Sequence, residues 1–436
     1  MQKLAALYRQ FDPLRPLEAD AQGDALYVDW QKELAPADVK ALLVNSITLS
    51  SGVPVTRLFT GHRGVGKTTE LMRVKRMLEQ GAAGQKLFVS LLLAEEWVDL
   101  QDVSASEVVF QIVRQLVADL RDAGFNLGWT QFLEFFKEFG DLLKTEVELR
   151  SLEIGPDPVK FGVVLKGVPG ARPLLRKLLE QRLPRVYDLV NQVVLPEAQT
   201  WLRENRGCVG TLLIVDQLDR IPQKVINERG LTNHENLYLD SVGTLRALNC
   251  HVLYVAPIEL VYSRLRGRLS NFYGQVLSMP AIPVITRDGR ENPDGLAILR
   301  RIVAKRASRA GVDLTDVFTE EESLARLCRL SGGHVRSLCN LVRSTLELCG
   351  RLPVPPEAVE QTLRTWAADL AEPLRADEWA FLKSVHASRQ APDRREDEEL
   401  WNSLQREMFV LNYRDAIGSY CDWNPLVGLV SRGGIR

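Results

Sequence analysis

The chain has 436 residues, and its 55 basic and 56 acidic side chains give a formal charge of −1. This balance excludes a protein that binds nucleic acid through its overall charge, because such proteins carry a clear excess of Lys and Arg. Hydrophobic residues make up 45% of the chain, yet none of its apolar runs approaches the roughly 18 residues that a membrane span requires. The apolar run at the start is too short for a secretory signal. We therefore predict a cytoplasmic protein of two or three domains.

Residues 1–50 are predicted to form a leader that precedes the first strand. Pro36–Thr48 has the apolar spacing of an amphipathic helix. Tyr27 is a candidate contact for the base of a nucleotide, because leader segments of nucleotide-binding folds often pack there. An ordinary core tyrosine is the alternative. The inward residues of the helix are predicted to be Val39, Leu42, Leu43 and Ile47.

The segment Gly61–Thr68 fits the phosphate-binding pattern G-x-x-x-x-G-K-[ST] without a mismatch. Val55–Thr60 is predicted to be a buried strand before it, and Thr69–Gln80 a helix after it. Glycines let successive backbone N–H groups face a triphosphate, and the positive end of the helix adds to this attraction. Lys67 is predicted to reach the β- and γ-phosphates of ATP, and Thr68 to bind Mg²⁺. The predicted nucleotide-binding residues are Gly61, His62, Arg63, Gly64, Val65, Gly66, Lys67, Thr68 and Thr69.

Four further apolar segments are predicted to be strands of the same sheet. One of them is followed by Asp216, which is expected at the carboxyl edge of the sheet, where NTPases hold Mg²⁺ through water. Together with the glycine loop, this carboxylate predicts the second half of an NTPase site, with Thr68 and Asp216 at the metal. The four segments are Lys86–Leu93, Thr211–Val215, His251–Val255 and Gln275–Met279, and a helix is predicted at Ser104–Asp122.

A long span separates the second and third predicted strands. Thr145–Ile154 and Val159–Lys166 are predicted to form a β-hairpin. Arg172–Asn205 is predicted to form one or two long helices with a break at Pro184 or Pro196. The start of these helices is basic, which indicates either a solvated surface or a contact for phosphates or a partner. Its basic residues are Arg172, Arg176, Lys177, Arg182 and Arg185.

From about Thr286 onward the pattern predicts helices, and the last 64 residues or so change character again. In this C-terminal part, two short helices precede two strands joined by a turn at Gly418, an order typical of a winged-helix unit. The predicted helices are Gly295–Ala310, Glu320–Leu330, His334–Cys349, Pro356–Ala368, Asp377–Ser388 and Glu398–Arg406.

This order of elements resembles the AAA+ and STAND group of P-loop ATPases, particularly the branch related to origin-recognition ATPases. Leu58–Leu71 is similar to the glycine loop of bacterial STAND-type ATPases, Leu213–Arg220 to their Walker B segment, and Ser331–Arg336 to a lid signature. The resemblance implies an α/β fold with a parallel sheet ordered 5-1-4-3-2, a helical lid and a C-terminal winged helix. The implied parts are a leader at 1–50, an ATPase core at 51–285 with an insertion at about 124–205, a lid at 286–372 and a winged-helix-like domain at 373–436.

The resemblance also implies catalytic roles for Lys67, Asp216 and Arg336, the last as an arginine that senses the γ-phosphate. Where AAA+ proteins place a catalytic glutamate, this chain has Gln217. Glutamine can orient a water but cannot take its proton, so hydrolysis is predicted to be slow. Asp219 is the candidate substitute for the missing base.

Three arginines on a predicted helix, Glu259–Leu269, lie near the place where AAA+ arginine fingers occur. Their spacing does not select one of them, and a surface helix with three arginines is the alternative. They are Arg264, Arg266 and Arg268.

The leading hypothesis is an ATP-binding, slowly hydrolysing ATPase that acts as a molecular switch. It would control assembly with, or activation of, a separately encoded partner, and would form oligomers. STAND proteins of bacterial signalling and anti-phage defence work in this way. The second hypothesis is a DNA-handling AAA+ ATPase of the loader or transposition target-selection type, which the near-neutral charge disfavours. A third is a hydrolysis-dead scaffold with ATP as a structural ligand, which Gln217 favours.

Overall fold

The computed structural model describes residues 2–50, 52–125, 134, 137–138, 172–392 and 397–433. Packing divides the chain into two units. The predicted hairpin in 145–166 lies outside the described residues, and the predicted division into four parts stays a prediction. We use the name sheet unit for Leu43–Thr60 with Val74–Leu277, and the name lid unit for Met1–Leu42, Gly61–Arg73 and Ser278–Arg436.

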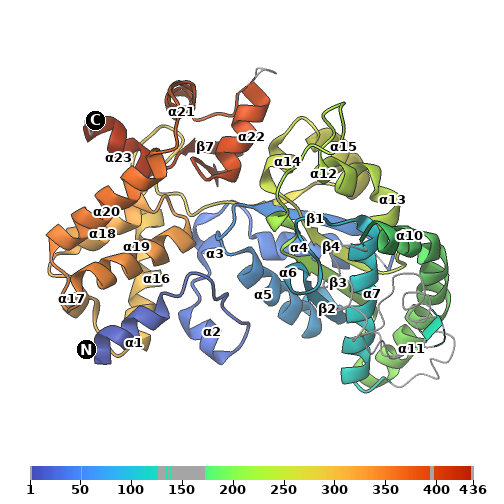
Figure 1. Cartoon of the computed structure of the whole chain (residues 1–436). Helices are drawn as coiled ribbons and strands as arrows, with labels where there is room; N and C mark the ends of the chain where they lie inside the picture. Colours follow the sequence, from blue (N-terminus) through green and yellow to red (C-terminus); the bar gives the residue numbers. More distant parts are fainter. Residues whose placement is uncertain are drawn as a thin grey trace. The chain divides into compact units, whose positions relative to one another are not determined.

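Five strands form one sheet in the order β2-β3-β4-β1-β5. Figure 1 labels β1, β2, β3 and β4 of this sheet. The pairs β2–β3, β3–β4 and β4–β1 are all parallel. A parallel sheet is covered on both faces, which explains why these strands read as continuous apolar runs. The order confirms the predicted fold class, an α/β P-loop fold with the sheet order 5-1-4-3-2. The strands are β1 (Thr56–Gly61), β2 (Leu87–Leu93), β3 (Gly210–Asp216), β4 (His251–Val255) and β5 (Leu277–Met279).

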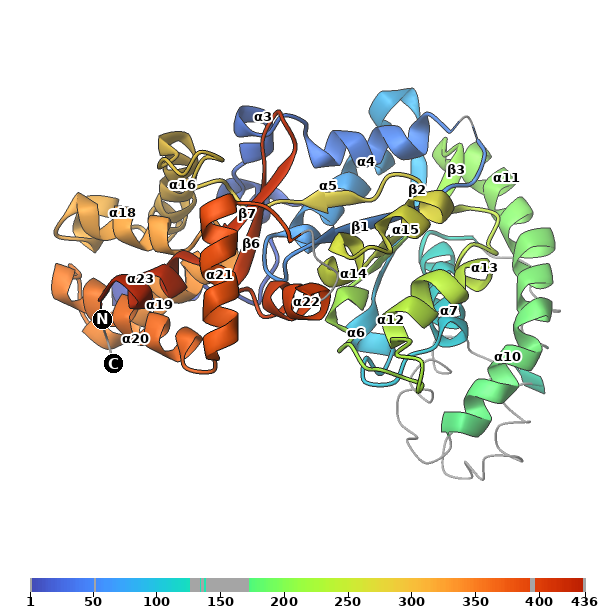
Figure 2. The same cartoon turned by 90° about the horizontal axis from the view of Figure 1, so that it is seen from above.

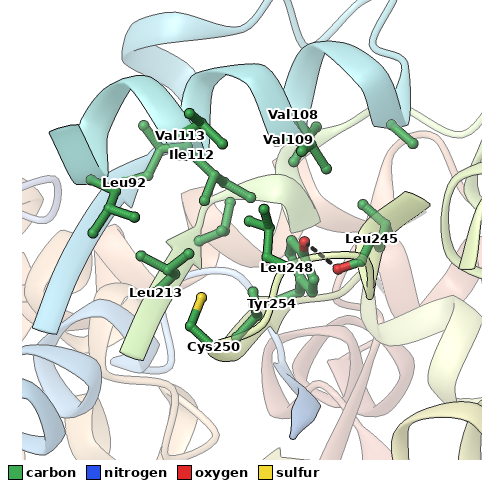
Figure 3. Packing of buried hydrophobic residues seen from close by; sticks show 14 of the residues in the cluster. Leu92, Val108, Val109, Ile112, Val113, Leu213, Leu245, Leu248, Cys250 and Tyr254 are labelled. Carbon is green, nitrogen blue, oxygen red and sulfur yellow. Dashed lines mark hydrogen bonds between the residues drawn. The ribbon is translucent and has the colours of Figure 1, made fainter. Parts of the chain in front are cut away.

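One face of the sheet packs against helix α7 (Ala105–Asp122), which lies beside β2 and β3 (Figure 1). The helix begins with a capping box, because Ser104 accepts from the N–H of Glu107 and the Glu107 carboxylate accepts from the N–H of Ser104. Apolar residues at helical spacing on α7 meet alternate residues of the strands (Figure 3). The labelled side chains in this core include Leu92, Val108, Ile112, Val113, Leu213 and Tyr254.

Two predicted helical segments of the sheet unit differ in detail from the structure, and several short helices of this unit were not predicted. The predicted helix at Glu259–Leu269 is two helices, because the backbone is extended at Ser263 and the Ser263 hydroxyl accepts from the N–H of Leu265. The predicted break in Arg172–Asn205 is a π-helical turn just before Pro196, and Pro184 lies inside a helix. The segments are α6 (Ala94–Trp97), α10 (Arg172–Leu189), η3 (Val190–Val194), α11 (Leu195–Arg206), η4 (Leu218–Arg220), α12 (Asn233–Glu235), η5 (Asn236–Asp240), α13 (Val242–Leu245), α14 (Ile258–Tyr262) and α15 (Arg266–Tyr273).

The leader folds into helices before β1, of which sequence patterns predicted one. That helix, α4 (Val39–Thr48), buries Val39, Leu43 and Ile47 as predicted, and Leu42 is half-buried. The other leader helices are α1 (Gln2–Gln10), α2 (Ala21–Leu26) and α3 (Trp30–Leu34), and η1 (Ala82–Gly84) follows α5 (Lys67–Glu79).

Four lid helices lie within three residues of their predicted bounds, and the short helix α17 was not predicted. In the lid unit α1 packs on α16 and α19, so the start of the chain belongs to the same bundle as the lid. Among the described helices, none is long and apolar enough to cross a membrane. The lid helices are α16 (Pro293–Arg309), α17 (Leu314–Val317), α18 (Glu321–Leu330), α19 (Val335–Cys349) and α20 (Pro356–Ala371).

The C-terminal part has the predicted order of two helices and an antiparallel hairpin, followed by a further helix (Figure 2). Helix α21 packs on β7 and α22 on β6, while α23 packs back on α20 of the lid. That this part is a winged helix stays a prediction. Its elements are α21 (Ala376–Ser388), α22 (Glu398–Arg406), β6 (Val410–Arg414), β7 (Ser419–Trp423) and α23 (Pro425–Gly433).

The buried hydroxyl of Tyr254 offers a test of the core in Figure 3. It donates to the carbonyl oxygen of Leu245 at 2.9 Å, and the Tyr254 side chain is fully buried. Tyr254→Phe keeps the ring but leaves that carbonyl without this donor, so the free energy of unfolding should fall by about 1–2 kcal/mol. Urea unfolding measures the change. An unchanged midpoint would contradict this packing, and an unchanged slope would show that the fold is retained.

Candidate nucleotide-binding site

The predicted phosphate loop connects β1 to α5. Gly61 and Gly64 have φ of 149° and 90°, which other residues rarely adopt. Both also lie against neighbouring atoms. A Cβ on Gly61 would be 2.7 Å from the carbonyl oxygen of Met279, and a Cβ on Gly64 would be 2.6 Å from the Cβ of Arg336. The backbone at these two positions therefore requires glycine.

The second half of the loop carries the groups predicted to bind the ligand. Gly66 has φ of 112°, and the space where its Cβ would stand is open. Lys67 is buried, and its Nζ donates to the carbonyl oxygens of Gly61 at 2.6 Å and His62 at 2.9 Å. Thr68, half-buried, follows in the first turn of α5. An ammonium and a hydroxyl therefore lie at a helix N-terminus, where anions are stabilised.

His334 holds the loop from the lid. It is the N-cap of α19, where its Nδ1 accepts from the N–H of Ser337 at 3.2 Å. In a neutral ring the other nitrogen then carries the proton. That nitrogen, Nε2, lies 2.7 Å from the carbonyl oxygen of Arg63 and donates to it. The start of the lid helix is thus hydrogen-bonded to the glycine loop.

His62 holds the loop to the C-terminal hairpin. Its Nε2 accepts from the backbone N–H of Asn412 in β6 at 3.2 Å and lies 3.1 Å from the Asn412 side-chain amide. The side chain of Gln405 in α22 donates in turn to Oδ1 of Asn412 at 3.2 Å. His62, Asn412 and Gln405 are all buried. Buried polar groups of this kind specify one arrangement, because each loses its partner if the others move.

Burial keeps both histidines neutral. Burial, the nearby His334 imidazole and the Lys67 ammonium lower the pKa of His62 to about 3, although the Gln405 carbonyl opposes the shift. Burial lowers the pKa of His334 to about 4, with Arg336 and Lys67 adding to the effect and the Arg63 carbonyl opposing it. A lone pair on each ring therefore remains available as a hydrogen-bond acceptor at neutral pH.

Arg336, the predicted sensor of the γ-phosphate, lies directly on the loop. Its backbone N–H donates to the carbonyl oxygen of Gly64 at 3.2 Å. Its Nε donates to the carbonyl oxygen of Pro13 in the leader, also at 3.2 Å. The structure thus brings lid, leader and loop together at this side chain. Contact with a γ-phosphate stays a prediction.

A buried charge cluster holds the first turns of α5. The Tyr27 hydroxyl donates to Glu70 at 3.0 Å, and Lys40 Nζ lies 3.2 Å from Glu70 and 2.8 Å from Asp29. The Arg73 guanidinium stacks on the Tyr27 ring at 3.6 Å. Burial raises the pKa of Glu70, although Lys40 opposes the shift. These contacts give Tyr27 a structural role at α5, which supports the alternative of a core tyrosine. Its predicted contact with the base stays untested.

Thr69 completes the contacts between leader and loop. Its hydroxyl oxygen accepts from the N–H of Leu17 at 3.1 Å, and Arg73 donates to the carbonyl oxygen of the same leucine at 3.1 Å. Both backbone groups of Leu17 are therefore bound by α5. The leader lies along the helix that begins at the phosphate loop.

The predicted acidic residues lie together in the sheet unit, where the parallel strands β1, β3 and β4 end at one edge. Asp216 is buried, and its Oδ1 accepts from the N–H of Gln217 at 2.7 Å. Gln217 has φ of 69°, in the left-handed region that is rare for residues with a side chain. Its buried Oε1 has no hydrogen-bond partner among the described residues. Asp219 follows in η4 and is also buried.

The three arginines considered as fingers lie at exposed positions around α15. Arg264 lies in the connection between α14 and α15, not on a helix. Arg266 lies over the Tyr262 ring at 5.9 Å, and Arg268 is 4.0 Å from Asp240. These contacts select none of the three as a finger.

Four residues of this site were missed by sequence reasoning. The lid signature contained His334 but did not indicate that it binds the loop. Asn412 and Lys40 gave no signal, because each acts through a partner far away in the sequence. Glu70 stands three residues after the loop lysine in the sequence, but the sequence does not show that Lys40 and Tyr27 bind it.

No protein-family model matches the sequence, and no curated protein matches it. Solved structures aligned with the chain include the ORC2 protein of Aeropyrum pernix in ADPNP–ADP complexes, at 15% identity and a TM-score of 0.40. That alignment covers 97% of this chain and 96% of that chain. A Walker-type ATPase of Pyrococcus abyssi is 16% identical with a TM-score of 0.44, covering 97% of this chain and 99% of that chain.

The RuvB Holliday junction branch migration motor of Thermotoga maritima is also similar. It is 12% identical with a TM-score of 0.35, and the alignment covers 97% of this chain and 98% of that chain. Similarity at these levels does not carry function from those proteins to this chain.

The neutral histidines predict an acid-sensitive fold. Because the folded pKa values of His62 and His334 lie below the ordinary value near 6.5, the unfolded chain binds more protons between about pH 4 and 6.5. Their contribution to the free energy of unfolding is present above about pH 6.5 and is lost as the pH falls. Each histidine should add a slope of up to about 1.4 kcal/mol per pH unit in that window.

His62→Gln tests this slope, because a glutamine side-chain oxygen can accept the N–H of Asn412 without titrating. Urea unfolding of both chains between pH 4.5 and 7.5 should show a smaller pH slope for the variant. His334→Gln should reduce the slope in the same way. Equal slopes for the unaltered chain and His62→Gln would show that His62 is not held neutral.

Proposed function

We propose that the chain binds ATP with Mg²⁺ and hydrolyses it slowly, acting as a switch for a separately encoded protein partner. The observation that carries this proposal is the glycine loop itself. Its glycines have the backbone that the motif requires, and Lys67 and Thr68 open α5. His334 of the lid contacts the loop, and Leu17 of the leader contacts Thr69 directly after it. A nucleotide there would touch groups that also hold the lid.

The loop can exchange its internal hydrogen bonds for bonds to phosphate. The Lys67 ammonium donates to carbonyl oxygens of its own loop, so the charge is partly satisfied before a ligand arrives. Phosphate oxygens are stronger acceptors than carbonyls because they carry charge. The ammonium should therefore move from Gly61 and His62 to the β- and γ-phosphates of ATP.

The donors present fit a hard cation. Mg²⁺ prefers oxygen ligands, and the Thr68 hydroxyl and the Asp216 carboxylate are the residues that would hold it. When bound, Mg²⁺ neutralises charge on the phosphates. Gln217 can orient an attacking water through its side-chain oxygen, but it cannot accept the proton. Slow hydrolysis follows, unless Asp219 acts as the base.

The contacts of the loop support a switch. Three consecutive loop residues, His62, Arg63 and Gly64, are hydrogen-bonded to Asn412, His334 and Arg336. A ligand that alters this part of the loop changes the stability of those bonds, and so biases the position of the lid elements. Operation in bacterial signalling or anti-phage defence is proposed on the resemblance alone, as is homo-oligomer formation.

A protein partner fits the surface charge better than duplex DNA does. On the basic start of α10, Arg176 forms ion pairs with Asp102 at 2.9 Å and Glu107 at 3.5 Å. Arg185 pairs with Glu138 at 3.0 Å. Arginines that already pair with carboxylates are less available to DNA phosphates. Tight binding of DNA requires that a protein neutralise many phosphates.

Lys67→Ala tests nucleotide binding. Removing the ammonium that faces the β- and γ-phosphates should weaken ATP binding at least tenfold, about 1.4 kcal/mol or more. Isothermal titration calorimetry measures the affinity. The control is Lys75→Ala on the same helix, which pairs with Glu79 away from the loop and should leave the affinity unchanged. Equal ATP affinities for Lys67→Ala and the unaltered chain would contradict the assignment of the glycine loop as the ATP-binding loop.

Gln217→Glu tests the cause of slow hydrolysis. A carboxylate at this position can accept the proton of the attacking water, so steady-state ATP turnover should rise while ATP affinity stays nearly the same. Asp219→Asn serves as the matched control, because it removes the alternative base. A flat rate for Gln217→Glu combined with a large loss for Asp219→Asn would identify Asp219 as the base.

Arg336→Ala tests the lid arginine. If its guanidinium leaves Pro13 to meet a γ-phosphate, its loss should weaken ATP binding several-fold more than ADP binding. Calorimetry with both nucleotides gives the ratio. Arg329→Ala, at a half-buried position in the preceding helix and paired with glutamates, is the control. Equal losses for ATP and ADP would mean that Arg336 only holds the leader on the loop.

A further inference from the structure

The lid unit contains a cavity of about 440 Å³ that no part of the glycine loop lines. It lies between the leader, from Ala6 to Leu26, and the end of helix α16. This volume is within the range of small-molecule sites, roughly 300–1,000 Å³. Its apolar wall includes Pro16 and Leu17, and its charged wall includes Arg306. A molecule with an apolar and a charged part matches such a lining.

Arg306 is the feature of this cavity that calls for a ligand. The side chain is 94% buried, since its exposed fraction is 6%. Its Nη1 donates to Ile302 of its own helix at 3.1 Å, while its Nε has no partner among the described residues. The Arg306 side chain also hydrogen-bonds with the Cys339 thiol of α19, and no carboxylate is hydrogen-bonded to it in the described part of the chain. A buried guanidinium without an anion is destabilising, because its charge has lost water without gaining a partner of opposite charge, so an anion from outside would stabilise it.

Further charges surround the cavity at its exposed rim. Arginines and carboxylates both occur there, and none of them forms an ion pair within the described residues. Two of the carboxylates already accept backbone N–H groups, Asp12 from Leu14 at 3.0 Å and Asp20 from Gly23 at 2.7 Å. The charged lining residues are Arg9, Arg15, Arg306 and Arg309 against Asp12, Glu18 and Asp20. The lining thus has one more positive than negative charge, and its buried charge is positive.

We propose that this cavity binds a small phosphorylated organic molecule, with its phosphate on Arg306 and on the rim arginines. Guanidinium groups bind phosphate oxygens with charge-assisted hydrogen bonds, and the apolar wall accepts the organic part. The site is independent of the proposed ATP site in its residues, because none of its lining residues lies in Gly61–Thr69. A link between the two exists through Leu17, which lines the cavity and is bound by Thr69.

The test uses ribose 5-phosphate and inorganic phosphate as probes on the Lys67→Ala chain, in which the glycine loop is weakened. Ligand-observed phosphorus NMR near physiological salt measures binding. Ribose 5-phosphate should bind this chain as it binds the unaltered one, and more tightly than inorganic phosphate. Adding Arg306→Gln should weaken it at least about tenfold. The control Arg301→Gln, exposed on the same helix and paired with Glu33, should change nothing.

A replacement variant and a competition experiment with ATP complete the test. If Arg306→Gln fails to fold, the rim variant Arg15→Gln with Arg309→Gln replaces it and should weaken binding several-fold. Saturating ATP on the unaltered chain should leave ribose 5-phosphate bound. The proposal is overturned by displacement with ATP, by loss of binding in Lys67→Ala alone, by no effect of the Arg306 or rim variants, or by no binding of either probe. ATP affinity measured on the same variants separates this failure from failure of the ATP site.

Discussion

The glycine loop depends on two imidazole rings that stay uncharged. His62 accepts from the N–H of Asn412, and a proton on that nitrogen would set two donors against each other. His334 accepts from the N–H of Ser337 at its other nitrogen, which directs its own proton to the loop. Both rings are buried, and burial is what disfavours their charged forms. Desolvation therefore fixes the hydrogen-bond pattern around the loop.

The buried groups at helix α5 differ from the two histidines, because they are charged groups that pair with one another. Glu70 is buried one turn after Lys67, and Lys40 and Tyr27 from the leader both bind it. Removing one member would leave a buried charge without compensation, which typically costs more than the pair contributes. Separating the leader from the helix would therefore cost free energy, because it would break these buried pairs.

Much of the fold could be predicted from the sequence, because strands and helices follow local periodicity. Periodicity predicted the bounds of four lid helices within three residues, whereas the order of the sheet was predicted from the resemblance to P-loop ATPases. The break at Ser263 was not, since a serine fits a helix pattern and its cap forms only in the folded chain. The loop residues were found by their spacing. Asn412 and Lys40 were not, because their roles depend on contacts more than 25 residues away.

The two halves of the glycine loop differ in what their groups contact. Its first half, His62 to Gly64, is occupied by hydrogen bonds from β6 and α19. Its second half has an open space at Gly66 and a lysine bonded back to the loop's own carbonyls. A ligand that draws Lys67 away removes a donor from the carbonyl oxygen of His62, the residue whose ring is held by the hairpin. The same short segment therefore links the position proposed for the phosphates to the C-terminal hairpin. No further helix or strand is needed to transmit the loss of the Lys67–His62 hydrogen bond.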